Sequence, residues 1–129
     1  MHIDASAMVA IIMREEGFVE LTERLARAPR RTTSPVSVLE TVIAVGRVTG
    51  DRSAGILAAR DFLDKAKVDV VAADAGLIDG LADAHLRYGK GSLSPARLNL
   101  GDCFSYALAK RDKVGLLYKG NDFSHTDLA

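Results

Sequence analysis

The chain has 129 residues with 17 basic and 17 acidic side chains, so its formal net charge is zero. A chain of this length is most simply one domain, here residues 1–129, and an apolar content of 48% argues against disorder. The balanced charge says nothing about partners, because it can hide a strongly acidic site beside a basic surface. A single cysteine excludes a disulfide framework, which fits the reducing cytoplasm.

No apolar run approaches the roughly 20 residues that a membrane-spanning helix needs. The N-terminal segment has an apolar stretch but no basic leader, and an acid already stands at position 4, so it does not resemble a signal peptide. We therefore expect a cytoplasmic protein that does not enter a membrane.

Short apolar strands alternate with helices along the whole chain. In chain order, the pattern predicts a strand at 1–4, helices at 5–17 and 18–28, a strand at 31–34, helices at 35–50 and 51–67, a strand at 68–74, a helix at 75–89, a polar loop from 90, a helix at 101–113 and a strand at 114–120. The helix that starts at Pro35 is apolar almost all round, so we expect it to be buried. In the helix at 51–67, four apolar side chains are expected to point inward: Ile56, Leu57, Phe62 and Leu63.

This alternation predicts an α/β domain with a central parallel sheet of four to five strands, covered by helices on both faces. In such sheets the ligand site lies beyond the carboxyl ends of the strands. Asp4 closes the first strand, Asp102 lies in the first turn of the last long helix, and Asp122 follows the last strand. Glu40, in the helix that follows Pro35, is the fourth acid near this edge.

Glu40 is the most informative of the four acids, because its neighbours in the helix are apolar. A buried carboxylate costs several kcal/mol unless something compensates it. Two carboxylates about 4 Å apart repel by roughly 4 kcal/mol at an effective dielectric constant of about 20. A divalent cation relieves both costs, and oxygen ligands without His or Cys select a hard ion such as Mg²⁺ or Mn²⁺. The four acids together therefore predict a metal site that a phosphate can approach.

Each acid also has a plain structural interpretation when it is taken alone. Asp4 and Asp102 suit N-caps or the favourable end of a helix dipole, and Asp122 suits a turn. Glu40 suits a narrow polar stripe that faces solvent. The placement of all four at one edge of the sheet favours a shared site over these separate roles.

Four segments match one family in order and spacing: HIDASA at 2–7, SPVSVLE at 34–40, LNLGDCFSYALAKR at 98–111 and LLYKGNDFSHTDL at 116–128. An isolated DAS carries little information, whereas its combination with NLGDC and KGNDF is specific. On these residues the chain resembles the PIN-domain ribonucleases, in particular the VapC-type toxins of bacterial toxin–antitoxin pairs. The resemblance covers the whole chain.

The resemblance implies a PIN fold and cleavage of RNA phosphodiester bonds that depends on Mg²⁺ or Mn²⁺. Asp4, Glu40 and Asp102 fall on the acidic positions of the family motif, and Asp122 falls on the fourth, more variable position. On this assignment Asp4 and Asp102 hold the main metal, while Glu40 and Asp122 bind it directly or through water. Whether Asp122 or the adjacent Asn121 fills the fourth position stays open, as does the number of metal ions.

Substrate contacts are expected from residues beside these acids. Ser6 falls on the small hydroxyl residue that accompanies the first aspartate of the family, and both Ser6 and Asn121 can orient a water or a phosphate oxygen. RNA also needs cations, and the candidates nearest the predicted edge are Arg14, Arg97 and Lys119, with Arg87 and Lys90 expected farther away. Such cations bind phosphates and give affinity without sequence choice.

The resemblance also implies partners. A VapB-type antitoxin is expected to block the acidic groove, because an Arg or Lys side chain can occupy a cavity built for a cation. The toxin is expected to form a homodimer. The helices within 18–28 and 54–66 carry enough apolar surface for such contacts, but the sequence does not assign them to dimer, antitoxin or core.

Three other functions are considered for this sequence. A catalytically silent PIN-like module would bind RNA or protein without cutting, although the presence of all four acids argues against it. A Mg²⁺-dependent phosphatase of the haloacid type needs a second aspartate two residues after the first, where this chain has Ser6. A response-regulator receiver needs a phosphoaccepting aspartate after a central strand, a role into which only Asp74 could be forced.

Overall fold

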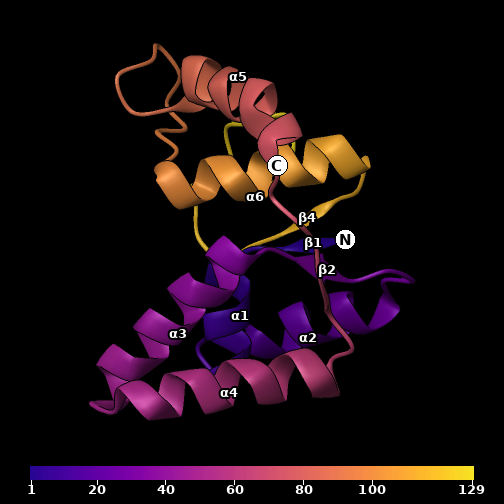
Figure 1. The fold of residues 1–129 in the computed structure, drawn as a ribbon, viewed down its shortest axis with the longest axis vertical. Coiled ribbons are helices and arrows are strands. Elements are labelled where there is room, and N and C mark those ends of the chain that lie inside the picture. Colours follow the sequence, from indigo (N-terminus) through magenta and orange to yellow (C-terminus); the bar gives the residue numbers. More distant parts are fainter.

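The computed structural model describes all 129 residues as three layers, with one parallel sheet between two groups of helices (Figure 1). The strands are β1 (His2–Ile3), β2 (Thr32–Thr33), β3 (Asp69–Val70) and β4 (Leu116–Leu117), in the sheet order β3-β2-β1-β4. All three pairings are parallel, and His2 lies opposite both Thr32 and Leu116. The predicted α/β architecture is confirmed, with four strands.

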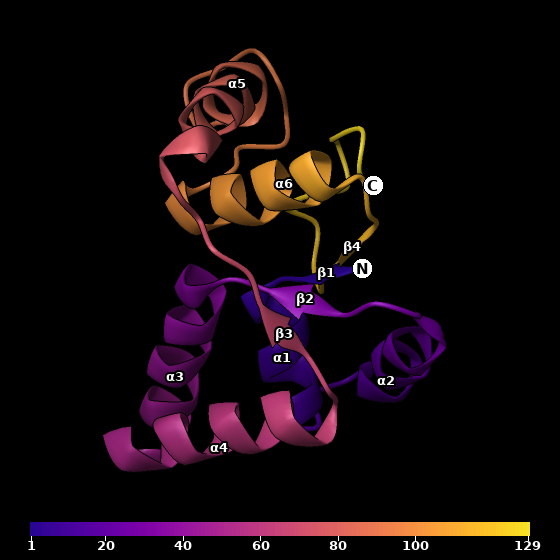
Figure 2. The ribbon, with the colours of Figure 1, turned by 45° about the vertical axis from the view of Figure 1, so that its right-hand side comes forward.

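Six α-helices and one 3₁₀ turn surround the sheet: α1 (Ala5–Ile12), α2 (Phe18–Arg27), α3 (Pro35–Thr49), α4 (Arg52–Lys65), η1 (Ala75–Leu77), α5 (Ile78–Tyr88) and α6 (Leu100–Asp112). Figure 2 shows α1 to α4 on one side of the strands and α5 and α6 on the other. None of these helices combines the length and the apolar character that crossing a membrane requires.

Two hydrophobic clusters hold the layers together, one on each face of the sheet. Ile3 and Leu117 point into the cluster beneath the sheet, where Leu21 of α2 and Phe62 of α4 are also buried. Leu116, the neighbour of Leu117, belongs to the cluster that contains side chains of α5 and α6. Successive side chains of a strand point to opposite faces, so even these two-residue strands join both clusters.

Capping side chains fix where the helices begin at the carboxyl edge of the sheet. Asp4 follows β1 directly and caps α1 by accepting the Ser6 amide hydrogen, and Ser34 follows β2 and caps α3. Asn99 and Asp102 form a reciprocal capping box at the start of α6. Because α6 runs back toward the start of β4, its first turn lies at the same edge as the starts of α1 and α3.

Two predictions about helix ends and faces are wrong. The first helix ends at Ile12 rather than near Gly17, because the chain turns at Arg14, whose backbone is left-handed (φ 52°). In α4, Ile56 and Leu57 are exposed instead of pointing inward. The inner face of α4 is formed partly by small residues that approach α3 closely, so these larger side chains lie outside the contact.

The prediction that α3 is buried on all sides is also wrong. Its buried face consists mainly of small residues, among them Ser37, Thr41 and Val45, which lie toward the neighbouring helices. The apolar Leu39 and Ile43 remain 59% and 44% exposed. The apolar character of α3 therefore belongs partly to an outer surface rather than to the core.

Candidate active site

The carboxylate of Asp4 is held firmly at the end of β1, where the residue is only 4% exposed. Its Oδ2 accepts hydrogen bonds from the Ser6 amide and hydroxyl at 2.9 and 2.6 Å, and its Oδ1 accepts one from the Ser105 hydroxyl at 2.6 Å. Asp4 is thus an N-cap and also a carboxylate oriented from two elements. Ser105 is not among the predicted site residues, although its spacing of three residues from Asp102 puts both on one face of α6.

Asp102 lies in the first turn of α6 and is 8% exposed. Its Oδ2 accepts the Asn99 amide hydrogen at 3.0 Å, and Asn99 Oδ1 accepts the Asp102 amide hydrogen at 2.9 Å. Burial raises the pKa of Asp102 to about 6, although the hydrogen bond from Asn99 lowers it. The charges of Asp4 and Asp122 add to the rise, and Lys90 opposes them.

Glu40 reaches from α3 to the first turn of α6. Its carboxylate lies against Gly101, since a Cβ atom placed there would overlap Glu40 Oε2. Burial raises the pKa of Glu40 to about 7, and the charges of Asp4 and Asp102 contribute to the rise. No basic side chain lies within ion-pair distance of this carboxylate.

Three carboxylates from three elements therefore share one region: Asp4, Glu40 and Asp102. Their donor atoms are all oxygens and their mutual repulsion is not neutralised by a paired basic side chain, a combination that fits a hard divalent cation. They do not form a finished coordination shell, because no group of three or more His, Cys, Asp or Glu side chains is arranged to hold a metal ion. A cation would have to draw the carboxylates closer together.

The fourth predicted position lies in the turn after β4. Asp122 is exposed, and its charge acts on Asp102. Asn121 is also exposed, and its backbone oxygen accepts hydrogen bonds from the amide and hydroxyl of Ser124 at 3.1 and 2.6 Å. The charge of Asp122 therefore reaches Asp102, while the backbone of Asn121 shapes the turn.

Ser6 links Asp4 to the segment after β4. Its hydroxyl donates to Asp4 and accepts the backbone amide hydrogen of Lys119 at 3.1 Å. The amine of Lys119 lies 2.9 Å from Glu15 Oε2, a partner that no local sequence pattern indicates. Ser6, Glu15, Glu40 and Lys119 line one open cavity of about 470 Å³. Lys119 is thus beside the acids, with its charge shared by Glu15.

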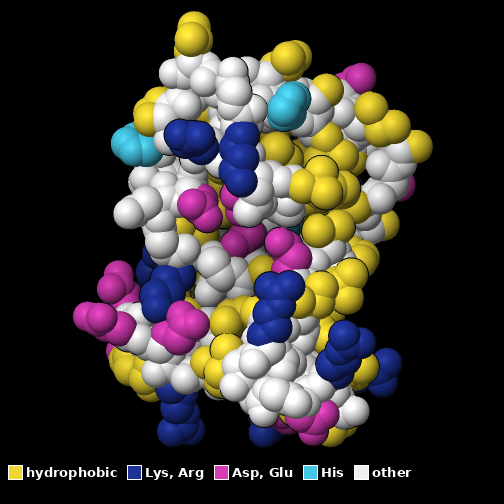
Figure 3. All heavy atoms as spheres, turned by 90° about the vertical axis from the view of Figure 1, so that its left-hand side faces the viewer, with side chains coloured by type: hydrophobic (Ala, Val, Ile, Leu, Met, Phe, Trp, Pro, Cys, Tyr) yellow, Lys and Arg dark blue, Asp and Glu magenta, His cyan; other side chains and the backbone are white.

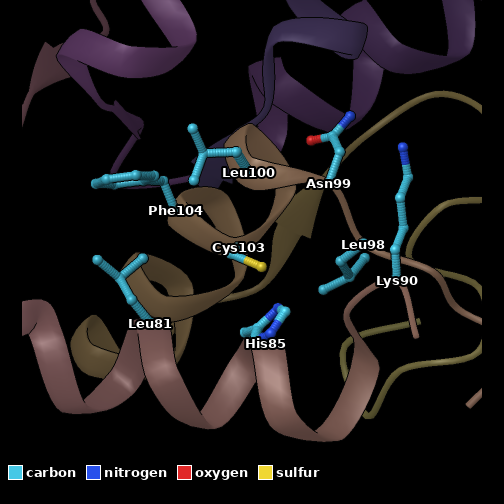
Figure 4. Close-up of a pocket in the computed structure, with 8 residues that line it drawn as sticks. All are labelled: Leu81, His85, Lys90, Leu98, Asn99, Leu100, Cys103 and Phe104. Atoms are coloured by element: carbon cyan, nitrogen blue, oxygen red, sulfur yellow. The ribbon is translucent and has the colours of Figure 1, made fainter. Parts of the chain in front are cut away.

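The other predicted cations near the edge, Arg14 and Arg97, are exposed and make no side-chain hydrogen bond or ion pair with the acids. Lys90, which we expected farther away, instead lowers the pKa of Asp102. Lys90 and Asn99 line one end of an apolar hollow of about 480 Å³ between α5 and α6 (Figure 4). The hollow and the acidic site therefore share the first turn of α6.

The surface around the site combines both charges. Figure 3 shows acidic side chains gathered in a hollow at the middle of one face, between the two groups of helices. Lys and Arg side chains stand above and below this hollow, and hydrophobic side chains border one flank. A polyanion that approaches the acids therefore passes a rim of positive charges, which attract it despite the zero net charge.

Comparison with known proteins agrees with this architecture. Residues 1–128 match the PIN domain family. A VapC ribonuclease of Rhizobium meliloti (strain 1021) is 42% identical over 98% of this chain and 97% of that protein. A VapC ribonuclease of Mycobacterium bovis is 41% identical over 99% of this chain and 96% of that protein. Ribonuclease VapC of Mycolicibacterium smegmatis is 44% identical over 100% of this chain and 98% of that protein.

A solved structure supports the fold independently of close sequence similarity. The crystal structure of Mycobacterium tuberculosis VapC20, a Sarcin-Ricin loop cleaving toxin, aligns with this chain with a TM-score of 0.76 at 20% sequence identity. The alignment covers 99% of this chain and 95% of VapC20. Together with the matches over almost the full length, this means that the chain belongs to the PIN-domain family, as one of its VapC ribonucleases.

Proposed function

We propose that this chain is a toxin that cuts RNA at the acidic site, with Mg²⁺ or Mn²⁺ as its cofactor. The observation that carries the proposal is the crowding of Glu40, Asp102 and Asp4, which helps raise the pKa of the first two. Uncompensated carboxylates at close quarters cost stability, so their convergence favours a site that receives a cation.

In this proposal Asp4 and Asp102 hold the main cation, and Glu40 and Asp122 bind it directly or through water. The cation would supply positive charge that offsets the negative charge developing on the phosphoryl and leaving oxygens. No nearby histidine or cysteine is required, because carboxylate oxygens are the ligands that Mg²⁺ and Mn²⁺ prefer.

The chain's own hydrogen bonds would keep these ligands in place. Ser6 and Ser105 donate to the two oxygens of Asp4, and the Asn99 amide donates to one oxygen of Asp102. Partners of this kind restrict the rotation of a metal ligand, and because they donate to the carboxylate they favour its charged form, which is the form that binds a cation. The second oxygen of Asp102 accepts no hydrogen bond and stays available for a cation.

RNA would be held through its phosphates by cations at the rim of the site. Lys119 and Lys90 act there, and Arg97 is a further candidate from the sequence. Asn121 and Ser6 would orient a water or a phosphate oxygen beside the scissile bond. Contacts to phosphate position the strand and supply affinity, whereas they do not select a sequence.

Cleavage of RNA by the purified chain, freed of any partner, tests the proposal. We expect cleavage with Mg²⁺ or Mn²⁺, no cleavage with EDTA, and loss of cleavage in Asp4→Asn with unchanged circular dichroism. The matched control is Asp127→Asn, which removes a carboxylate that pairs with Lys110 at the other end of α6 and is expected to leave cleavage intact.

Three results would contradict the proposal in different ways. Cleavage that persists in Asp4→Asn would remove the assigned site. Metal-dependent RNA binding without cleavage would favour the silent binding module. Hydrolysis of p-nitrophenyl phosphate with RNA untouched would favour the phosphatase.

We also propose that a VapB-type antitoxin inhibits the chain in the cytoplasm by placing an Arg or Lys side chain among the carboxylates. Glu40 has no basic partner of its own, so the cavity has room and charge for such a side chain. A small protein encoded beside this chain should therefore copurify with it and suppress cleavage. Retained inhibition after its basic residues are changed to Gln would contradict this mode of binding.

A second copy of the chain is the proposed occupant of the apolar surface beside the site. Leu39 of α3, Ile78 of α5 and Leu100 of α6 are 59%, 62% and 80% exposed, and Leu100 also borders the hollow in Figure 4. Figure 3 shows hydrophobic side chains side by side along one flank of the acidic hollow, and a contiguous exposed apolar surface is typical of interfaces. Light scattering should give the mass of a homodimer, and Leu100→Glu should shift it toward the monomer.

A further inference from the structure

Helix α6 has a glycine in its first turn, directly before Asp102. Gly101 is buried, and the Glu40 carboxylate of α3 lies against it. A Cβ atom at this position would overlap Glu40 Oε2 and would lie 2.5 Å from Oε1 and 2.6 Å from Cδ. Any other residue at this position would therefore push the Glu40 carboxylate away from its observed place.

The backbone of α6 does not itself require this glycine. Gly101 lies within a helix and is not among the glycines with positive φ, which are Gly17, Gly50, Gly91 and Gly120. Alanine favours a helix over glycine by roughly 1 kcal/mol. The glycine thus weakens α6 locally, and what it makes room for is the carboxylate of Glu40.

In this contact the Glu40 carboxylate experiences two opposing electrostatic effects, one from the start of α6 and one from the neighbouring aspartates. The dipole and the free N–H groups at the start of α6 favour a negative charge there. The same position puts the carboxylate within the influence of Asp4 and Asp102, whose charges contribute to its raised pKa. A small displacement of Glu40 would therefore change its relation to both aspartates.

We propose that Gly101 is a positioning residue, whose missing side chain lets Glu40 of α3 rest on α6 beside Asp4 and Asp102 and so completes the acidic site. The inference rests on the proposed function, because the place of Glu40 matters for cleavage only if the acids act together. Gly101 itself touches neither the RNA nor the cation in this arrangement.

The test compares Gly101→Ala with the matched control Gly80→Ala. Gly80 lies in α5, where a Cβ atom would meet Ala107 Cβ at 3.6 Å, an ordinary contact. Both substitutions improve a helix, so the midpoint of thermal unfolding should stay constant or rise in both. We expect Gly101→Ala to lower kcat for RNA cleavage by about 10- to 100-fold with little change in KM, and Gly80→Ala to preserve both.

Binding of Mn²⁺ alone, measured by calorimetry, gives a readout that does not depend on cleavage. We expect Gly101→Ala to weaken Mn²⁺ binding by about tenfold, the range seen when the surroundings of a metal ligand are disturbed. In a Glu40→Ala background no carboxylate remains to be displaced, so Gly101→Ala should have no further effect there. Independent, additive effects of the two substitutions would overturn the inference.

Failure of the inference and failure of the proposed function are distinguishable. If the wild-type chain cleaves RNA and Gly101→Ala cleaves it equally well, the inference is overturned and the proposed function stands. If the wild-type chain does not cleave RNA, the proposed function fails, and Mn²⁺ binding then decides whether Gly101 positions Glu40. Weaker binding by Gly101→Ala than by Gly80→Ala then supports the positioning role, and equal binding overturns it.

Discussion

At the start of α6, burial and the neighbouring carboxylates raise the pKa of Asp102 to about 6, and no basic side chain forms an ion pair with it. Near the end of α6, the hydrogen bond from Arg111 lowers the pKa of Asp112, and the hydrogen bond from Lys110 lowers that of Asp127. The acids near the end of α6 are thus paired with basic side chains, and we call this the matched end. Asp102 at the start of α6 has no such partner, and we call this the unmatched end.

The acid–base pairs at the matched end stabilise the fold. Asp127 accepts hydrogen bonds from the buried Tyr106 hydroxyl at 2.7 Å and from Lys110 at 2.9 Å, and so ties the C-terminal segment to α6. The unmatched end holds Asp102 and the adjacent Glu40 in a state that a cation would relieve. On the proposed function, the carboxylates without a cation that cluster at this sheet edge make the start of α6 the end that acts on RNA.

The largest expected effect comes from removing the charge at the unmatched end. Asp102→Asn should reduce RNA cleavage by roughly 100-fold or more, because on the proposed function several kcal/mol of transition-state stabilisation would depend on the cation that Asp102 holds. Its free energy of unfolding should stay constant or rise, since the substitution relieves repulsion and an Asn side chain can still accept the Asn99 amide hydrogen. Cleavage assays and urea titrations measure the two quantities, and a large loss of stability would contradict the comparison.

The pH dependence of stability should differ between the wild-type chain and Glu40→Gln in EDTA. The pKa of Glu40 is about 7 in the folded chain against 4.5 for a free carboxyl, so between these values only the folded chain holds the proton. Its stabilising contribution is therefore complete below about pH 4.5 and is lost as the pH rises through 7. We expect a relative loss on the order of 1 kcal/mol, after allowance for solvent screening of a half-buried group.

Urea titrations of both proteins across this pH range measure that difference. His2 has the opposite dependence, because burial lowers its pKa to about 4, but it is present in both proteins and cancels. A difference that does not change with pH would mean that Glu40 does not belong to the uncompensated cluster.

The smallest expected effect concerns the matched end. Tyr106→Phe removes the hydroxyl that donates to Asp127 and should lower the free energy of unfolding by about 1 kcal/mol. RNA cleavage per folded molecule should not change, because the hydroxyl makes hydrogen bonds with Asp127 and Arg87 and with none of the acids of the site. Equal stability with reduced cleavage would reverse the roles assigned to the two ends.

Most of the acids of the candidate site could be predicted from the sequence. Strand ends and helix starts leave local signals, such as an apolar run that stops at Asp4 or the cap before Asp102. Parallel strands bring such positions to one edge, which is why Asp4, Glu40 and Asp102 are predicted together. The partners of these acids leave weaker signals, and Ser105 and Gly101 are found only when α6 is seen against its neighbours.

Periodicity and capping within short segments were enough to predict the α/β class, the order of strands and helices along the chain, and the acids at the carboxyl edge. The folded molecule adds three contacts: Ser105 orients Asp4, Glu40 rests on Gly101, and Glu15 pairs with Lys119. These contacts join residues distant in the chain, and they depend on how closely whole helices approach, which no local pattern encodes. For the same reason the exposure of Leu39 and Ile43 differs from the prediction that α3 is buried.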